Sequence, residues 1–150
     1  EIRLSLVGSE MCIRDSLYCN DYVGASRFQR TDMEMAIVNG IRLYLPDEIF
    51  VKPGGGEYQR FYVGPTVEQI INMDPSEAAD SENIIPAIKE NFIHADIRYA
   101  GGLIYLVCME DIIHNITEDD PLLGYLLELD DQTIKFGLSQ YAVILAQKRG

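Results

Sequence analysis

The chain has 150 residues, of which 24 are acidic and 12 are basic, and 47% are hydrophobic. This length suits one domain with a substantial core, and the composition excludes a disordered tail, a collagen-like chain and a disulfide-stapled miniprotein. The net charge of −12 argues against a nucleic-acid-binding module and against a polybasic membrane-surface protein. No apolar run reaches the roughly 18 residues that suggest a membrane span.

The first sixteen residues differ from the rest of the chain. Their apolar run, 4–7, is too short for the core of a signal peptide. The stretch 7–16 reads VGSEMCIRDS and is similar to translated sequencing-adapter read-through, the alternative being a short native strand and turn. We therefore interpret 1–16 as a non-native tail and 17–150 as the part that folds. Two cysteines, Cys19 and Cys108, remain in that part, in apolar surroundings, which predicts buried free thiols and a reducing cytoplasm.

The first predicted elements are a strand end, a capped helix and an arm. Residues 17–22 are expected to be the end of a strand. The run 31–34 (TDME) is a capping box, and it opens an amphipathic helix that Pro46 ends. Residues 46–65 are expected to form two short extended arms around the glycines at 54–56. We interpret these glycines as a flexible hairpin tip rather than a nucleotide loop, because no helix follows them.

The middle of the chain predicts two short helices and a strand. The run 66–69 (TVEQ) is a second capping box, and the helix it opens is broken at 74–77. Ser81 is expected to cap another helix, which ends at Phe92. Residues 93–99 alternate between apolar and polar types, as in a strand with one wet face. The side chains predicted to face inward are Ile93, Ala95 and Ile97.

The C-terminal part predicts two more helices and a last strand. Residues 103–116 are apolar on nearly all sides, so we expect a buried element, and its length favours a helix. Pro121 begins a helix over 121–136, which Gly137 stops. Its apolar stripe is predicted to consist of Leu122, Tyr125, Leu126 and Leu129. Residues 139–147 are expected to form a buried terminal strand. This order of elements is typical of the α/β class, with a thin sheet whose neighbouring strands are missing.

Clusters of charged residues near the end of the chain offer only weak chemical sites. His114 follows Glu110 and Asp111 at a spacing that shares one helix face, but a metal site needs three or four ligands. Further acidic residues flank the helix 121–136, at 118–120 and at Glu128, Asp130 and Asp131. We interpret both groups as solvated helix surface, with the acids at 118–120 complementing the helix dipole.

The most informative segment is 20–31, which lies between a predicted strand end and a capped helix. Ligands of open α/β sheets bind beyond the carboxyl ends of strands. Tyr22, Arg27 and Gln29 in that position suit a polar or anionic ligand. The alternative is a strand-to-helix loop packed by Tyr22 and Phe28.

Four segments together resemble a branch of the class I S-adenosylmethionine-dependent methyltransferases. They are 20–29 (NDYVGASRFQ), 74–78 (DPSEA), 99–102 (YAGG) and 139–148 (SQYAVILAQK). In the first of them, Asp21 and Ala25 replace the usual Glu and Pro. The resemblance implies the C-terminal part of a Rossmann-like sheet: the end of the fifth strand at 17–22, followed by antiparallel sixth and seventh strands at 93–99 and 139–148. The helices 103–116 and 121–136 would be an insertion, and 46–65 an arm on the acceptor side.

The resemblance also implies the activity of a parent enzyme. Such enzymes transfer a methyl group from S-adenosylmethionine to an acceptor, here a small molecule of unspecified identity. They hold the cofactor with a Gly-rich turn after the first strand and an acidic residue that ends the second. A chain that begins near the fifth strand carries neither, so we expect an inactive fragment with no cofactor ligand. Tyr22, Arg27 and Gln29 are the substrate-side candidates, and no catalytic residue is assigned.

Two other functions remain as alternatives. The first is a stand-alone acidic α/β binding or interaction module without catalysis, which predicts a stable monomer or dimer. The second and weaker alternative is a small acidic hydrolase, for which no nucleophile elbow or triad spacing is present.

Overall fold

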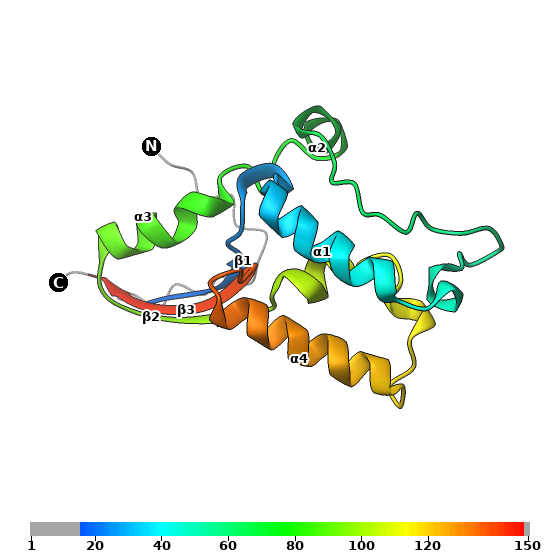
Figure 1. Cartoon of the computed structure of the whole chain (residues 1–150). Coiled ribbons are helices and arrows are strands. Elements are labelled where there is room, and N and C mark those ends of the chain that lie inside the picture. Colours follow the sequence, from blue (N-terminus) through cyan, green and yellow to red (C-terminus); the bar gives the residue numbers. More distant parts are fainter. Residues whose placement is uncertain (1–15, 149–150) are drawn as a thin grey trace. The chain divides into compact units, whose positions relative to one another are not determined.

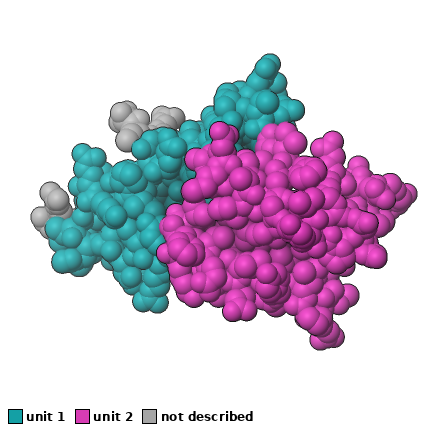
Figure 2. Space-filling model, viewed as in Figure 1, with its two compact units in different colours: residues 1–29, 65–100, 139–150 teal, residues 30–64, 101–138 magenta. Residues whose placement is uncertain are grey.

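The computed structural model describes residues 16–148, so the predicted non-native tail lies outside it except for Ser16. The described chain divides into two compact units, which Figure 2 shows in different colours. Unit 1 comprises residues 16–29, 65–100 and 139–148, and unit 2 comprises residues 30–64 and 101–138. The chain therefore leaves unit 1 and returns to it twice.

Unit 1 is built on a three-stranded sheet whose order is β1-β3-β2 (Figure 1). Its strands are β1 (Ser16–Tyr22), β2 (Phe92–Ala100) and β3 (Tyr141–Lys148). β3 is antiparallel to both neighbours, so β1 and β2 run in the same direction on either side of it. The α/β class is confirmed, and the last two predicted strands do pair antiparallel. The central strand of the sheet is the last one in the sequence.

The core of unit 1 lies between this sheet and helix α3 (Ile84–Asn91). Ile88 of α3 is 2% exposed and belongs to the same buried cluster as the inward side chains of β1 and β3. Those side chains are Leu17, Cys19, Ala142, Ile144 and Ala146. Ala95 and Ile97 of β2 pack against the cluster, as the alternation predicts.

Two expectations about unit 1 are wrong in detail. A bulge between Phe92 and His94 breaks the alternation of β2, so Ile93 is 51% exposed and Phe92 packs on the core instead. Ser81 does not cap a helix, because its hydroxyl donates to the carbonyl of Gly24 at 2.9 Å. A 3₁₀ turn, Ser81–Asn83, precedes α3 there. The second predicted capping box is confirmed: Thr66 opens α2 (Val67–Met73).

Unit 2 contains two long helices, α1 (Asp32–Tyr44) and α4 (Pro121–Lys135). The predicted capping box at Thr31 is present with both of its hydrogen bonds. Asp120 caps α4, and Gly137 follows the helix with a φ of +81°, a left-handed conformation that glycine adopts without strain. The predicted stripe of α4 needs one correction. Tyr125 is 59% exposed, because the buried face is centred on Leu126 and continues to Asp130 and Thr133.

The arm over 46–65 is only partly extended. A 3₁₀ helix, Asp47–Phe50, replaces the first extended segment, because Ile49 and Phe50 turn into the core of unit 2. A single bridge between Val51 and Glu57 then closes a short hairpin. The glycines at its tip, 54–56, all have positive φ, which explains three glycines in a row.

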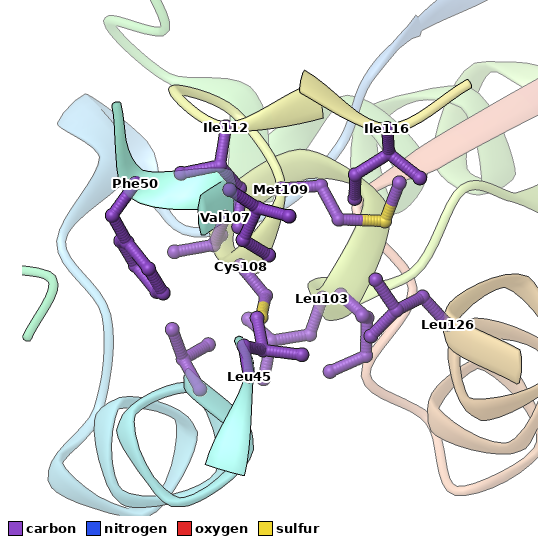
Figure 3. Packing of buried hydrophobic residues seen from close by; sticks show 12 residues of the cluster. Leu45, Phe50, Leu103, Val107, Cys108, Met109, Ile112, Ile116 and Leu126 are labelled. Atoms are coloured by element: carbon purple, nitrogen blue, oxygen red, sulfur yellow. The ribbon is translucent and has the colours of Figure 1, made fainter. Parts of the chain in front are cut away.

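The segment 103–116 forms the centre of the core of unit 2, as its apolar composition predicts, but it is not a regular α-helix. One π-helical segment spans Ile104–Cys108, and a 3₁₀ turn follows at Ile113–Asn115. Figure 3 shows its side chains packed with Leu45, Phe50 and Leu126. The buried members from this segment are Leu103, Ile104, Val107, Cys108, Met109, Ile112 and Ile116. Within residues 16–148, none of the helices has the length and hydropathy that a bilayer crossing requires.

Candidate functional site

The loop that follows β1 is closed by Tyr22, the last residue of the strand. The Tyr22 hydroxyl donates to the carbonyl of Ala25 at 3.0 Å, and its ring lies 4.8 Å from the ring of Phe28. A Cβ at Gly24 would stand 2.5 Å from both the Tyr22 hydroxyl oxygen and Oε1 of Gln140. Glycine is therefore the residue that lets the loop fold tightly over the tyrosine.

The backbone of this loop is strained. Arg27 and Phe28 have φ values of 55° and 54°, and Ala78 has a φ of 45°. These are all the non-glycine residues with positive φ in the described part of the chain, and Arg27 donates its amide to the Ala78 carbonyl at 2.7 Å. Each such residue costs on the order of 1–3 kcal/mol, and such strain concentrates at functional sites. The strain in unit 1 is thus gathered at one place.

The three predicted site residues lie in this loop, but their polar groups already have partners in the protein. The Arg27 guanidinium donates to the carbonyl of Glu77 at 3.0 Å. The Gln29 amide donates to the carbonyls of Arg27 and Pro65, at 2.7 and 3.0 Å. Tyr22 is buried. These bonds hold the loop in shape, so the first role of Tyr22, Arg27 and Gln29 is to position it.

Sequence reasoning did not identify several residues that complete the site. The Ser81 hydroxyl binds the Gly24 carbonyl, and the Val23 amide donates to the Gln140 carbonyl at 2.9 Å. The Ser26 hydroxyl oxygen is shut off from solvent and has no hydrogen-bond partner within residues 16–148. Buried polar groups are nearly always paired, so this unpaired hydroxyl is an exception among the polar groups of the loop. No local pattern could have revealed these contacts, since their partners lie far apart in the sequence.

Acidic groups around the loop differ in how readily they ionise. Burial raises the pKa of Asp21 on β1, although the Tyr22 amide opposes this by donating to the carboxylate. The pKa of Asp74 is lowered, because the hydroxyl and amide of Ser76 donate to it and the positive charge of Arg27 lies nearby. The carboxylate of Asp74 therefore ionises readily, in the electrostatic field of the Arg27 guanidinium.

Residues from all four segments of the methyltransferase resemblance lie at one end of the sheet of unit 1. Tyr22, at the end of β1, is paired with Tyr141 at the start of β3, and Tyr141 is paired with Ala100 at the end of β2. The Ser139 hydroxyl donates to the Ala100 carbonyl at 3.3 Å. The 74–78 segment joins through the bonds from Arg27. The carboxyl ends of the two parallel strands therefore share one edge with the strained loop, where ligands of α/β sheets bind.

Unit 2 holds a second group of polar residues, centred on Arg42 of α1. Its side chain is fully buried and binds the Asp111 carboxylate with two nitrogens, at 2.7 and 3.1 Å. It also donates to the carbonyls of Gln59, Arg60 and Cys108. A guanidinium that is satisfied in this way has a structural role, because it ties α1 to the arm and to 103–116.

The residues predicted to share a helix face near His114 separate in the structure. Asp111 binds Arg42, while the His114 ring makes an edge-to-face contact with Tyr58, with ring centroids 5.7 Å apart. Burial raises the pKa of Glu110, which lies beside the Tyr62 phenol. Burial also raises the pKa of the Cys108 thiol to about 11, so the thiol stays protonated near neutral pH. Across residues 16–148 no three His, Cys, Asp or Glu side chains come together as a metal would require.

The residues present do not fit S-adenosylmethionine. Within 16–148 no Gly-rich turn joins a strand to the N-terminus of a helix, and the glycines at 54–56 sit at a hairpin tip instead. No chemical step is therefore derived through this cofactor. No family model, curated protein or solved structure matches the chain. The interpretation of the site consequently rests on its own geometry and on the sequence resemblance.

Proposed function

We propose that residues 17–150 form the C-terminal part of a class I S-adenosylmethionine-dependent methyltransferase, whose parent enzyme transfers a methyl group to a small acceptor. The observation that carries the proposal is the convergence of four sequence segments, separated by up to about a hundred residues, at one end of the sheet. Three of the segments contain strand ends that pair in the sheet, and the fourth is hydrogen-bonded to the loop, as the resemblance implies. The antiparallel pairing of β2 and β3 supports the same reading.

The proposed role of the site is to hold the acceptor. The loop 23–29 projects beyond the carboxyl end of β1, and its strained backbone is fixed by the segment 77–82. Tyr22, Arg27 and Gln29 shape the loop, and the Ser26 hydroxyl is the group left to bind a polar ligand. Methyl transfer depends mainly on holding donor and acceptor in line, so we assign no catalytic base.

The alternative that remains is a stand-alone binding or interaction module. The observation in its favour is that each unit encloses its own buried apolar cluster, so both units have the basis for independent stability. This alternative predicts a sharp, cooperative melt and a monodisperse species for the 150-residue chain. The methyltransferase proposal predicts association through the exposed edge of β1 beside 17–22.

The first experiment is isothermal titration of the 150-residue chain with S-adenosylhomocysteine. We expect no binding, because the described residues offer no cradle for it. Tight stoichiometric binding would contradict the proposal, because it would show that this chain contains the cofactor-binding part of the enzyme. The second experiment reads the nucleotide sequence upstream of the Leu17 codon from an independent source. We expect an open frame that encodes a Gly-rich strand-turn-helix, and a frame without one contradicts the proposal.

The extended protein then allows the site itself to be tested. Ser26→Ala should raise KM for the acceptor at least tenfold while leaving the affinity for S-adenosylhomocysteine within twofold. Tyr18→Phe, near the opposite end of β1, is the matched control, because it also removes one hydroxyl, and it should change neither. If Ser26→Ala changes neither quantity, the loop does not hold the acceptor.

A further inference from the structure

β2 is an edge strand of the sheet. In the order β1-β3-β2 it pairs with β3 along one side, and residues 16–148 provide no strand for its other side (Figure 1). An edge strand leaves alternate backbone N–H and C=O groups unpaired, and these groups can accept another strand. At nine residues, β2 is long enough to offer several such groups.

The outward face of β2 carries opposite charges two residues apart. Asp96 and Arg98 lie on the same face, where the Arg98 guanidinium is 3.1 Å from the Asp96 carboxylate. Both side chains are mostly exposed, at 52% and 77% respectively. An exposed ion pair of this kind contributes little to stability, so its charges can be paired with others at small cost.

This pattern is self-complementary about Ile97. If a second copy of β2 pairs antiparallel with the first and the two-fold axis passes through Ile97, Asp96 of each copy lies opposite Arg98 of the other. An axis through Asp96 or through Arg98 would place like charges opposite each other, which is destabilising. Of these three registers, the charge pattern favours the one about Ile97.

The other face of β2 complements itself in the same register. Residues on one face of a strand alternate, so Ala95, Ile97 and Tyr99 share a face. Tyr99 is 51% exposed, and pairing about Ile97 places it opposite the small side chain of Ala95 in the other copy. The exposed tyrosine of one copy would thus cover the alanine of the other, and the Ile97 side chains of the two copies would contact each other. Aromatic and β-branched neighbours across strands stabilise such pairs.

The high net negative charge of the chain favours association of two copies through the β2 edge rather than through acidic surface. The whole chain carries a net charge of −12, so two copies repel each other over much of their surface. β2 contains one Asp and one Arg, whose opposite charges cancel. The bulge between Phe92 and His94 ends the regular edge, which limits the pairing to residues 94–100.

We propose that the β2 edge binds a second copy of this chain, through antiparallel pairing of 94–100 about Ile97 with reciprocal Asp96–Arg98 ion pairs. The result is a continuous six-stranded sheet with two-fold symmetry. This inference does not rest on the methyltransferase proposal, because it uses only the edge, the charges and the register of β2.

The test is sedimentation equilibrium of the 150-residue chain at moderate salt, together with two single variants and their combination. We expect the chain to dimerise. Asp96→Arg and Arg98→Asp each place like charges opposite each other, so each should raise the dissociation constant at least tenfold. The double variant, Asp96→Arg with Arg98→Asp, restores opposite pairing in the same register and should recover most of the lost affinity.

Lys52→Asp is the matched control, because it makes the same change of net charge as Arg98→Asp on the exposed hairpin of unit 2. It should leave the dissociation constant within threefold. Circular dichroism and thermal melting should show that all variants fold, since both substituted side chains are exposed. A chain that stays monomeric at high concentration overturns the proposal. So does association that the single variants leave unchanged, which would point to another surface such as the edge of β1.

Discussion

Replacement of Asp130 by asparagine should destabilise unit 2 strongly, because this carboxylate holds the start of the buried 103–116 segment. Asp130 is 5% exposed. It accepts hydrogen bonds from the amides of Gly102, Ile104 and Tyr105, at 2.7, 2.9 and 2.8 Å. One oxygen receives the bonds from Ile104 and Tyr105, and the other receives the bond from Gly102.

The magnitude follows from these three bonds. The carbonyl oxygen of an asparagine can keep the bonds from Ile104 and Tyr105, but its NH₂ group then faces the Gly102 amide, and two donors oppose each other. A hydrogen bond to a charged group contributes about 1.5–3 kcal/mol, and a buried donor without an acceptor costs about 1–3 kcal/mol. We expect Asp130→Asn to lower the free energy of unfolding by about 2–4 kcal/mol, a large part of the ~5–15 kcal/mol typical of a domain.

The assay is urea denaturation followed by far-ultraviolet circular dichroism, with Asp131→Asn as the control. Asp131 is the next residue on α4, and its side chain is exposed, so both variants remove the same charge. With a urea dependence of about 1–3 kcal/mol per molar, the midpoint of Asp130→Asn should fall by roughly 1–2 M. Hydrogen exchange should show lost protection at the Gly102 amide. Equal midpoints for the two variants would refute the reasoning.

Two further outcomes are expected. Gly102→Ala should destabilise the protein by about 1–3 kcal/mol, because its Cβ would stand 2.3 Å from the Thr133 hydroxyl. In the same urea assay, Gly124→Ala on the exposed side of α4 should stabilise the protein by up to about 1 kcal/mol. If Gly102→Ala is the more stable of the two variants, Gly102 is not crowded. Burial and a neighbouring carboxylate raise the pKa of Glu110 from 4.5, so the folded state keeps a proton that the unfolded chain releases. Wild-type stability should therefore fall relative to Glu110→Gln as the pH rises from 4.5 through the raised pKa, whereas a difference that does not change with pH contradicts the shift.

The sequence predicts the helix ends of this fold well, because the interactions at those ends are local. The capping boxes at Thr31 and Thr66 use residues three positions apart. Gly137 ends α4 because it adopts a left-handed backbone conformation without strain. The 103–116 segment shows the opposite case. An apolar run indicates burial but not geometry, and here the amides at its start are held by Asp130, more than twenty residues away in the sequence.

The candidate site likewise has features that the local sequence predicts and features that it does not. The composition of 20–31 indicates a loop beyond a strand and names Tyr22, Arg27 and Gln29. The strained backbone and the unpaired Ser26 hydroxyl depend on contacts with 77–82 and with Gln140, which no local pattern reports. The bulge that exposes Ile93 is likewise set by the pairing of two strands rather than by the sequence of either one.

The central position of β3 determines the order in which the chain can fold during synthesis. β1 and β2 have no hydrogen-bonded contact with each other, and only the last strand, Tyr141–Lys148, joins them. The ribosome therefore releases every residue of unit 2 before the sheet of unit 1 can close. Until then β1 and β2 expose their edges and their apolar side chains, which makes the nascent chain prone to association. Loss of β3 alone would leave two separate strands and no sheet, so the core of unit 1 forms only after Tyr141–Lys148 has been synthesised.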